Sequence, residues 1–225
     1  MGIVIVILII GGYIYFKGIS EPAELKKLIQ GRPQQQQDVI KYFFGKGGFL
    51  TKRITDAEYD NLVASTIKQS DFKQKALAKI GLDESQVSEI EPVHFEGWTF
   101  GKNVDWAKQG TDNKYRSSAY QITWLFFSSS QVYIYRNTIH FSKDDKKVST
   151  EEYFYKDITN FSTVTDTVEQ QFWNSNEKKY YVKNVDSNDF AITVPGDKFY
   201  CSMEQNDYTE RAIQGMKAKL REKKG

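Results

Sequence analysis

The spacing of apolar residues changes near Pro92, and this change predicts two different parts in the chain. Between Ser20 and Ile90 the apolar side chains recur every three to four residues, as in an amphipathic helix. From Val93 onward they alternate with polar side chains, as in a strand that is buried on one face. We therefore expect an α+β chain in which short helices precede a sheet-rich module.

The first part carries start and stop signals of short helices. The segment Thr55–Glu58 forms a capping box, in which the threonine hydroxyl and the glutamate carboxylate each accept a backbone N–H of the first turn. A second helix is predicted from Asp71 to Ile80, with Gly81 as its stop signal. Helices this short are only marginally stable in isolation, so they should pack on one another or on a neighbouring domain. We predict a helical stem over residues 20–91.

The second part contains about seven short strand-like segments, the first at Phe95–Phe100 and the last at Phe190–Val194. Among those between them are the separate segments Phe161–Thr165, Val168–Trp173 and Tyr180–Lys183. Aromatic and β-branched residues are frequent in them, and such residues favour pleated sheet. The chain then closes with a predicted helix that begins at a second capping box, Asp207–Glu210. The order of elements predicts an antiparallel β module over residues 92–225, capped by a C-terminal helix.

Met1–Phe16 contain no charged residue and consist almost wholly of Ile, Val, Leu, Gly and aromatic residues. As a helix this segment would be about 24 Å long, and extension to Ile19 with a snorkelling Lys17 gives about 28 Å, enough for a thin bilayer. A cleaved signal peptide is the main alternative, but the segment has neither a basic start nor a small-x-small cleavage site. A buried core strand is the other alternative. We predict a transmembrane anchor over residues 1–19.

The charges that follow the anchor predict its orientation. Lys17, Lys26, Lys27 and Arg32 all lie on its C-terminal side, and basic flanks stay in the cytoplasm. We therefore expect a single-pass protein of the cell membrane with the bulk of the chain in the cytoplasm. The single cysteine, Cys201, is compatible with this compartment and provides no disulfide framework.

The β module resembles a bacterial pleckstrin-homology-like (PH-like) or GRAM-type domain. The resemblance covers residues 93–224 and rests on the strand order, on the closing helix, and on the segments Tyr153–Phe161 and Phe190–Val194. It implies a seven-stranded antiparallel β-barrel or sandwich capped by the C-terminal helix. It also implies binding of a protein partner, or self-association, at an exposed sheet edge or at the groove between helix and sheet.

Three basic residues lie between the first two predicted strands, where lipid-binding PH domains carry a basic signature. If Lys108, Lys114 and Arg116 converged in one loop, they could hold a polyphosphate by charge-assisted hydrogen bonds. Asp105 and Asp112 lie in the same region and would weaken the positive potential. A possible contact with an anionic lipid and an ordinary solvated loop therefore both stay open.

Other chemistries have little support in the sequence. The formal net charge of +2 gives no field that would attract nucleic acid. His94 and His140 show no metal-ligand spacing, and the apolar neighbours of Cys201 should raise the pKa of its thiol. We expect no catalytic residue, no cofactor, no metal site and no small-molecule substrate. The sequence favours a membrane-anchored, non-catalytic adaptor or scaffold that binds a protein partner; the alternative is a PH-like module that binds anionic lipid.

Overall fold

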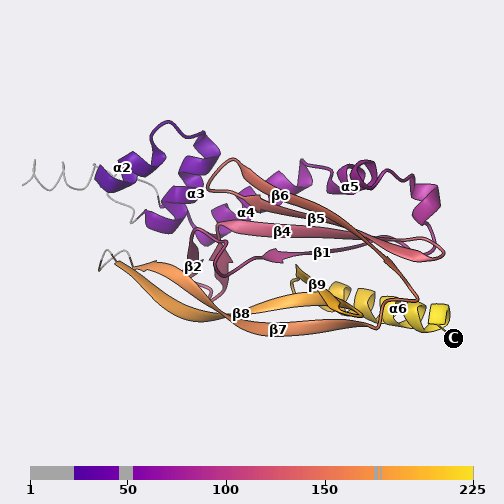
Figure 1. The fold of residues 1–225 in the computed structure, drawn as a ribbon. Helices are drawn as coiled ribbons and strands as arrows, with labels where there is room; N and C mark the ends of the chain where they lie inside the picture. The colour runs from indigo at the N-terminus through magenta and orange to yellow at the C-terminus, as the bar shows by residue number, and fades with distance from the viewer. Residues whose placement is uncertain (1–22, 46–52, 175–176, 178, 225) are drawn as a thin grey trace, which may run out of the picture.

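A computed structural model describes residues 23–45, 53–174, 177 and 179–224 (Figure 1). The helices are α2 (Ala23–Ile29), α3 (Gln34–Phe44), α4 (Asp56–Lys68), α5 (Phe72–Ile80), the 3₁₀ turn η1 (Glu84–Val87) and α6 (Asp207–Lys224). The strands are β1 (Val93–Trp98), β2 (Ala107–Gln109), β3 (Tyr115–Ser117), β4 (Ala119–Phe127), β5 (Gln131–His140), β6 (Asp145–Phe154), β7 (Asn160–Asn174), β8 (Lys179–Val194) and β9 (Asp197–Ser202). The predicted anchor lies outside these residues, and within them no helix is both long and apolar enough to cross a bilayer.

The start and stop signals of the stem helices act as predicted. Glu58 N–H donates to the Thr55 hydroxyl at 3.2 Å, and the Glu58 carboxylate accepts from Thr55 N–H at 2.9 Å, which completes the capping box of α4. The Asp71 side chain caps α5 by accepting from Gln74 N–H. Helix α5 ends at Gly81, whose φ of 79° lies in the left-handed region that suits glycine.

The strands form two separate sheets. The first, sheet A, has the order β1-β4-β5-β6, and the second, sheet B, has the order β3-β2-β7-β8-β9. Neither sheet closes into a barrel within the described residues, so the barrel form of the expectation is wrong. One pairing departs from the expected antiparallel pattern, because β2 pairs with β7 in parallel.

The expectation of about seven strands is wrong, since nine strands lie within the described residues. The segments Phe161–Thr165 and Val168–Trp173 are both parts of β7, and the segments Tyr180–Lys183 and Phe190–Val194 are both parts of β8. In the sequence, the polar residues between these segments suggest a break between two strands. In the structure, their side chains form hydrogen bonds between β7 and β8. Thr165 and Thr167 donate to Asn188 and Asp186 at 2.8 and 3.0 Å.

Three short strands escaped the sequence analysis. Strands β2 and β3 contain only three residues each, too few to show alternation. Strand β9 follows Pro195 and Gly196, and these two residues reverse the chain instead of ending the sheet. Gly196 has a φ of 84°, which glycine adopts at no steric cost.

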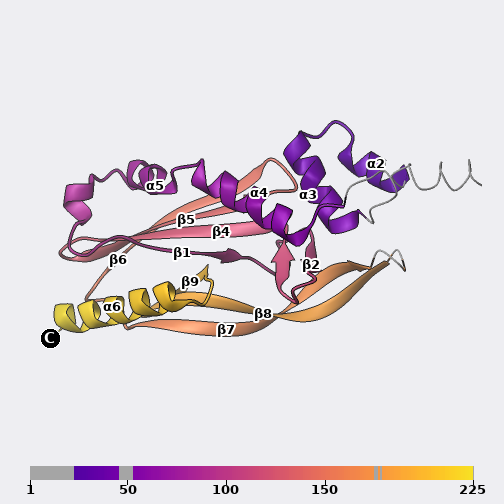
Figure 2. The ribbon, with the colours of Figure 1, turned by 180° about the vertical axis from the view of Figure 1, so that it is seen from behind.

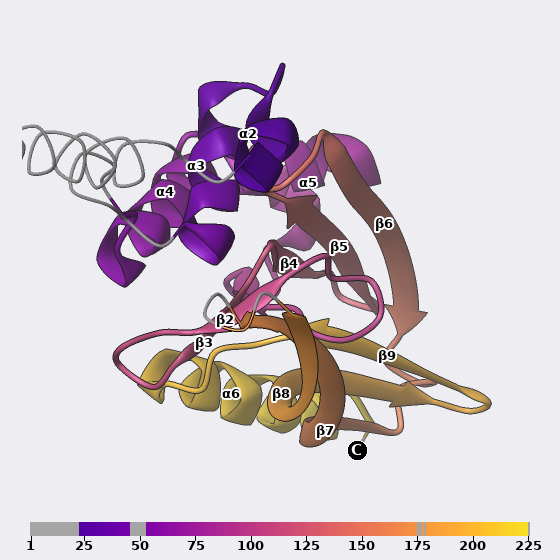
Figure 3. The ribbon, with the colours of Figure 1, turned by 90° about the vertical axis from the view of Figure 1, so that its left-hand side faces the viewer.

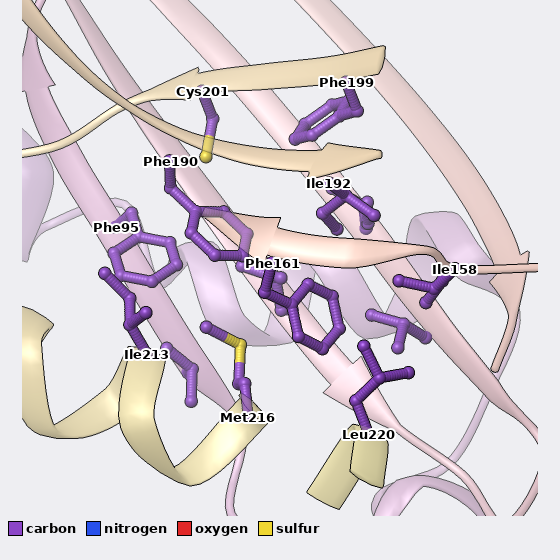
Figure 4. Packing of buried hydrophobic residues seen from close by; sticks show 14 of the residues in the cluster. Phe95, Ile158, Phe161, Phe190, Ile192, Phe199, Cys201, Ile213, Met216 and Leu220 are labelled. Carbon is purple, nitrogen blue, oxygen red and sulfur yellow. The ribbon is translucent and has the colours of Figure 1, made fainter. Parts of the chain in front are cut away.

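The first hydrophobic core lies between the two sheets and is closed by α6 (Figure 4). Ile213, Met216 and Leu220 point from α6 toward Phe161 of β7 and Phe95 of β1. Met216 is fully buried and Ile213 and Leu220 are nearly so, and this apolar face of α6 therefore closes the core.

The second hydrophobic core lies on the other face of sheet A, under helices α3 to α5 (Figure 2). It joins Tyr42 of α3 and Tyr59 of α4 to Tyr120, Ile122 and other residues of the sheet. The alternation of β4 thus sends Ile122 to this core and Leu125 to the first one. Sheet A is a central layer with helices on one face and sheet B on the other.

Candidate functional site

The three basic residues singled out in the sequence lie on the β2–β3 hairpin. Lys108 and Arg116 are directly opposite each other in the register of β2 and β3, and Lys114 lies in the connecting turn. Lys114 is exposed, Lys108 is half-buried and Arg116 is buried. The three residues lie on one hairpin, but the charged groups of Lys108 and Arg116 contact other groups of the protein.

Arg116 is held by two carboxylates. Its guanidinium donates to Asp60 of α4 through Nε and Nη2, both at 2.7 Å, and to Asp112 through Nη1 and Nη2 at 2.9 and 2.8 Å. These hydrogen bonds hold the pKa of Asp112 well below its usual range. Both forks of the guanidinium are therefore filled by internal carboxylates.

Lys108 is engaged with helix α3. Its Nζ donates to the Tyr42 carbonyl oxygen at 2.8 Å and lies 4.0 Å from the centre of the Tyr42 ring. Burial, together with the nearby charge of Arg53, lowers the pKa of Lys108 to about 8. The Tyr42 hydroxyl in turn donates to Asp56, so this cation belongs to a network that ties α3, α4 and the β2–β3 hairpin together.

A groove of about 670 Å³ runs along β1, the edge strand of sheet A, and we call it the β1 groove. One wall is α4, the other is the segment after β9, and Trp98 of β1 lies between Tyr59 and Tyr120. The charged residues that line it are Asp60, Glu96, Lys114, Arg116, Asp186 and Glu204. Since Asp60 and Arg116 pair with each other, Glu96, Asp186 and Glu204 face Lys114 alone among the described residues.

Glu96 and Glu204 form the acidic centre of the β1 groove. Burial raises the pKa of Glu96, and hydrogen bonding from Tyr120 partly opposes this shift. Desolvation also raises the pKa of the more exposed Glu204, and the charge of Glu96 raises it further. Neither carboxylate has an ion pair within 4.0 Å in the part of the chain that the structure describes. The groove therefore holds negative charge that it does not itself neutralise.

Gly97 brings the two acidic residues together. A Cβ at this position would lie 3.2 Å from the backbone of Met203, so only glycine allows the segment after β9 to approach β1 without a shift. The approach lets Glu204 N–H donate to the Glu96 carbonyl oxygen at 2.8 Å. Sequence analysis missed this pair, because Glu96 and Glu204 lie far apart in the chain. A glycine inside a predicted strand was the one available signal.

A second groove, of about 710 Å³, is basic and lies near the β5–β6 turn. Lys143 pairs there with Asp105 at 3.0 Å, and Arg136 donates to the Tyr200 carbonyl oxygen at 2.8 Å. Lys102, Lys146 and Lys147 are exposed along its rim. Two of its cations are thus used inside the protein, and the remaining three are ordinary solvated lysines.

The other singled-out side chains have structural surroundings. Cys201 is buried in the first core, and burial raises the pKa of its thiol to about 12, which confirms the expected direction. His94 stacks on Trp124 and lies 3.2 Å from the Tyr208 hydroxyl. His140 stands at the end of β5, away from His94. No group of three or more metal-ligating side chains occurs among the residues described.

Comparisons with protein-family models, curated proteins and solved structures returned no match for this chain.

Proposed function

We propose that this protein is a membrane-anchored, non-catalytic adaptor that binds a protein partner in the β1 groove on the cytoplasmic side of the cell membrane. The observation that carries the proposal is the unneutralised pair Glu96 and Glu204 beside the aromatic side chain of Trp98. Acidic groups next to an indole suit a segment that presents a lysine or arginine side chain. The uncharged segment Met1–Phe16 supports the anchor.

The PH-like character of the β module is part of the same proposal. Two sheets packed face to face, with α6 inserting Met216 and Leu220 between them, support it. A groove between a helix and a sheet edge is also the kind of place where such a module would take a peptide segment. The anionic-lipid alternative gains no support from the contacts, since Arg116 and Lys108 are occupied by internal partners.

A site-specific photo-crosslink in the full-length chain tests the partner. We would replace Ala64, an exposed residue of α4 in the β1 groove, by benzoylphenylalanine and irradiate intact cells. Asn61, exposed on the same helix but outside the groove, provides the control position. We expect one defined protein adduct from position 64 and none from position 61.

The same adduct should disappear when Glu96 and Glu204 are both replaced by glutamine. An adduct that survives this change would remove the acidic pair from the proposal, and equal adducts from both positions would remove the groove. Carbonate extraction and protease protection of the same cells test the anchor. Release of the chain by carbonate, or its digestion from outside intact cells, would contradict the proposed location.

A further inference from the structure

The end of the β7–β8 hairpin exposes apolar side chains on consecutive residues. Tyr180, Tyr181 and Val182 are 50%, 42% and 59% exposed, and together with Trp173 they form what we call the hairpin surface. Because side chains alternate along a strand, three such residues in a row place apolar groups on both faces of the ribbon. A hairpin in water normally keeps at least one face polar, so a run of this kind indicates a contact.

The hairpin surface has a fixed position relative to the helices. The Trp173 ring lies 5.0 Å from the ring of Tyr180, its cross-strand partner, and 5.6 Å from the ring of Phe44 at the end of α3. Phe44 also contacts Trp106 at 4.9 Å between ring centres. These contacts brace the hairpin against α3 and determine the direction in which it points.

The hairpin surface and the start of α2 lie at the same end of the molecule. Figures 1 and 2 show this from opposite sides, and Figure 3 looks directly at that end. The C-terminal end of α6 lies at the opposite end (Figure 1). Helix α2 begins at Ala23, four residues after the end of the predicted anchor at Ile19. Four residues span at most about 14 Å, so an anchored chain has this end next to the bilayer.

We propose that the hairpin surface rests in the headgroup region of the same bilayer that holds residues 1–19. The inference depends on the anchor of the proposed function. Tyrosine and tryptophan favour this region because the ring is apolar and the hydroxyl or indole N–H can still reach water. Lys179 pairs with Glu177 at 2.6 Å, so the charge of this lysine is balanced within the hairpin. Anchor and hairpin are then two attachments that fix the tilt of the molecule on the membrane.

A spin label reports this contact directly in the full-length chain. Cys201 is buried, so a cysteine introduced at Val182 is labelled selectively, as is one introduced at the exposed Phe154. Phe154 ends β6 near the C-terminal end of α6, so it serves as the control position (Figure 1). Each labelled chain is reconstituted into phosphatidylcholine–phosphatidylglycerol vesicles and isolated by flotation. Power-saturation spectroscopy then measures collisions with oxygen, which dissolves in lipid, and with a nickel chelate, which stays in water.

We expect the V182C label to lose its accessibility to nickel and to gain accessibility to oxygen, while the F154C label stays open to nickel. Equal nickel accessibility at both positions in floated vesicles would overturn the hairpin contact and leave the anchor standing. Shielding of the V182C label from both relaxants would mean that protein covers it, which also overturns the proposal. A chain that fails to float would instead contradict the anchor. Flotation therefore separates failure of the anchor from failure of the hairpin contact.

Discussion

The guanidinium of Arg116 joins helix α4 to the β2–β3 hairpin, and its loss should separate the two. In Arg116→Met the carboxylates of Asp60 and Asp112, each about two-fifths exposed, regain water, so the cost stays below that of a fully buried pair. We expect a loss of about 2 kcal/mol in the free energy of unfolding, measured by urea denaturation. Lys114→Met on the same hairpin should change it by less than about 0.5 kcal/mol. Equal losses in both variants would show that the pairing contributes little.

The carboxylate of Glu96 predicts a dependence of stability on pH. Its folded-state pKa is raised by burial, so the folded protein disfavours the charged form. The penalty is absent below the unfolded pKa, grows as the pH rises from there through the folded pKa, and is complete above it. Glu96→Gln should therefore raise the melting temperature at pH 7 and leave it almost unchanged at pH 4. Glu91→Gln, at an exposed position before β1, should change it at neither pH. A larger gain at pH 4 than at pH 7 would refute the direction of the shift.

At the scale of the elements, two glycines should respond to alanine in opposite ways. A methyl group at Gly97 would meet the Met203 backbone at 3.2 Å, so Gly97→Ala should move the segment after β9 and cost about 1–3 kcal/mol. Gly215 lies inside α6 with no atom within 4 Å of an added Cβ, so Gly215→Ala should stabilise the protein by about 0.5–1 kcal/mol. Thermal and chemical denaturation measure both changes. The same sign for both would show that backbone approach at β1 is unimportant.

Local signals in the sequence predict the stem helices well and the strands only in part. The box predicted at Asp207–Glu210 is wrong by one residue, because Asn206 and Thr209 make the reciprocal hydrogen bonds at the start of α6. The capping box at Thr55 and the stop signal at Gly81 depend only on neighbours within a few residues. Both partners of each interaction can therefore be read from the local sequence. The long strand β7 depends on distant residues instead. Its polar residues Thr165 and Thr167 become part of a strand only through their hydrogen-bond partners on β8. A polar stretch in isolation therefore looks like a turn.

The candidate site shows the same division between local and distant information. The positive charges of Lys108 and Arg116 are visible in the sequence, but the groups that accept their hydrogen bonds come from α3 and α4. The pair Glu96 and Glu204 exists only because β9 returns beside β1. The chemistry of each of these side chains depends on partners that are distant in sequence and become neighbours only in the fold. The spacing of residues in one sequence does not reveal those partners.

At the scale of the whole molecule, sheet A is shared by two cores, and this makes the helices part of the fold of the β module. A chain that begins at Val93 would expose Tyr120, Ile122 and Phe126, which are buried under α3 to α5. We expect such a chain to aggregate, or to unfold without a cooperative transition, under conditions in which a chain beginning at Ser20 is monomeric. Size-exclusion chromatography and thermal melting of the two chains check this. A monomeric, cooperative chain from Val93 would show that the module folds alone.

The central position of sheet A also has a consequence for synthesis on the ribosome. The Tyr59 hydroxyl donates to the Ser117 carbonyl oxygen, and the second core is complete only when Phe141 joins it. Translation adds roughly 5–20 residues per second, so the apolar faces of the finished helices wait for several seconds before their sheet exists. During that interval the nascent chain exposes these apolar helix faces to water. Binding by a chaperone would protect them until β4 and β5 emerge.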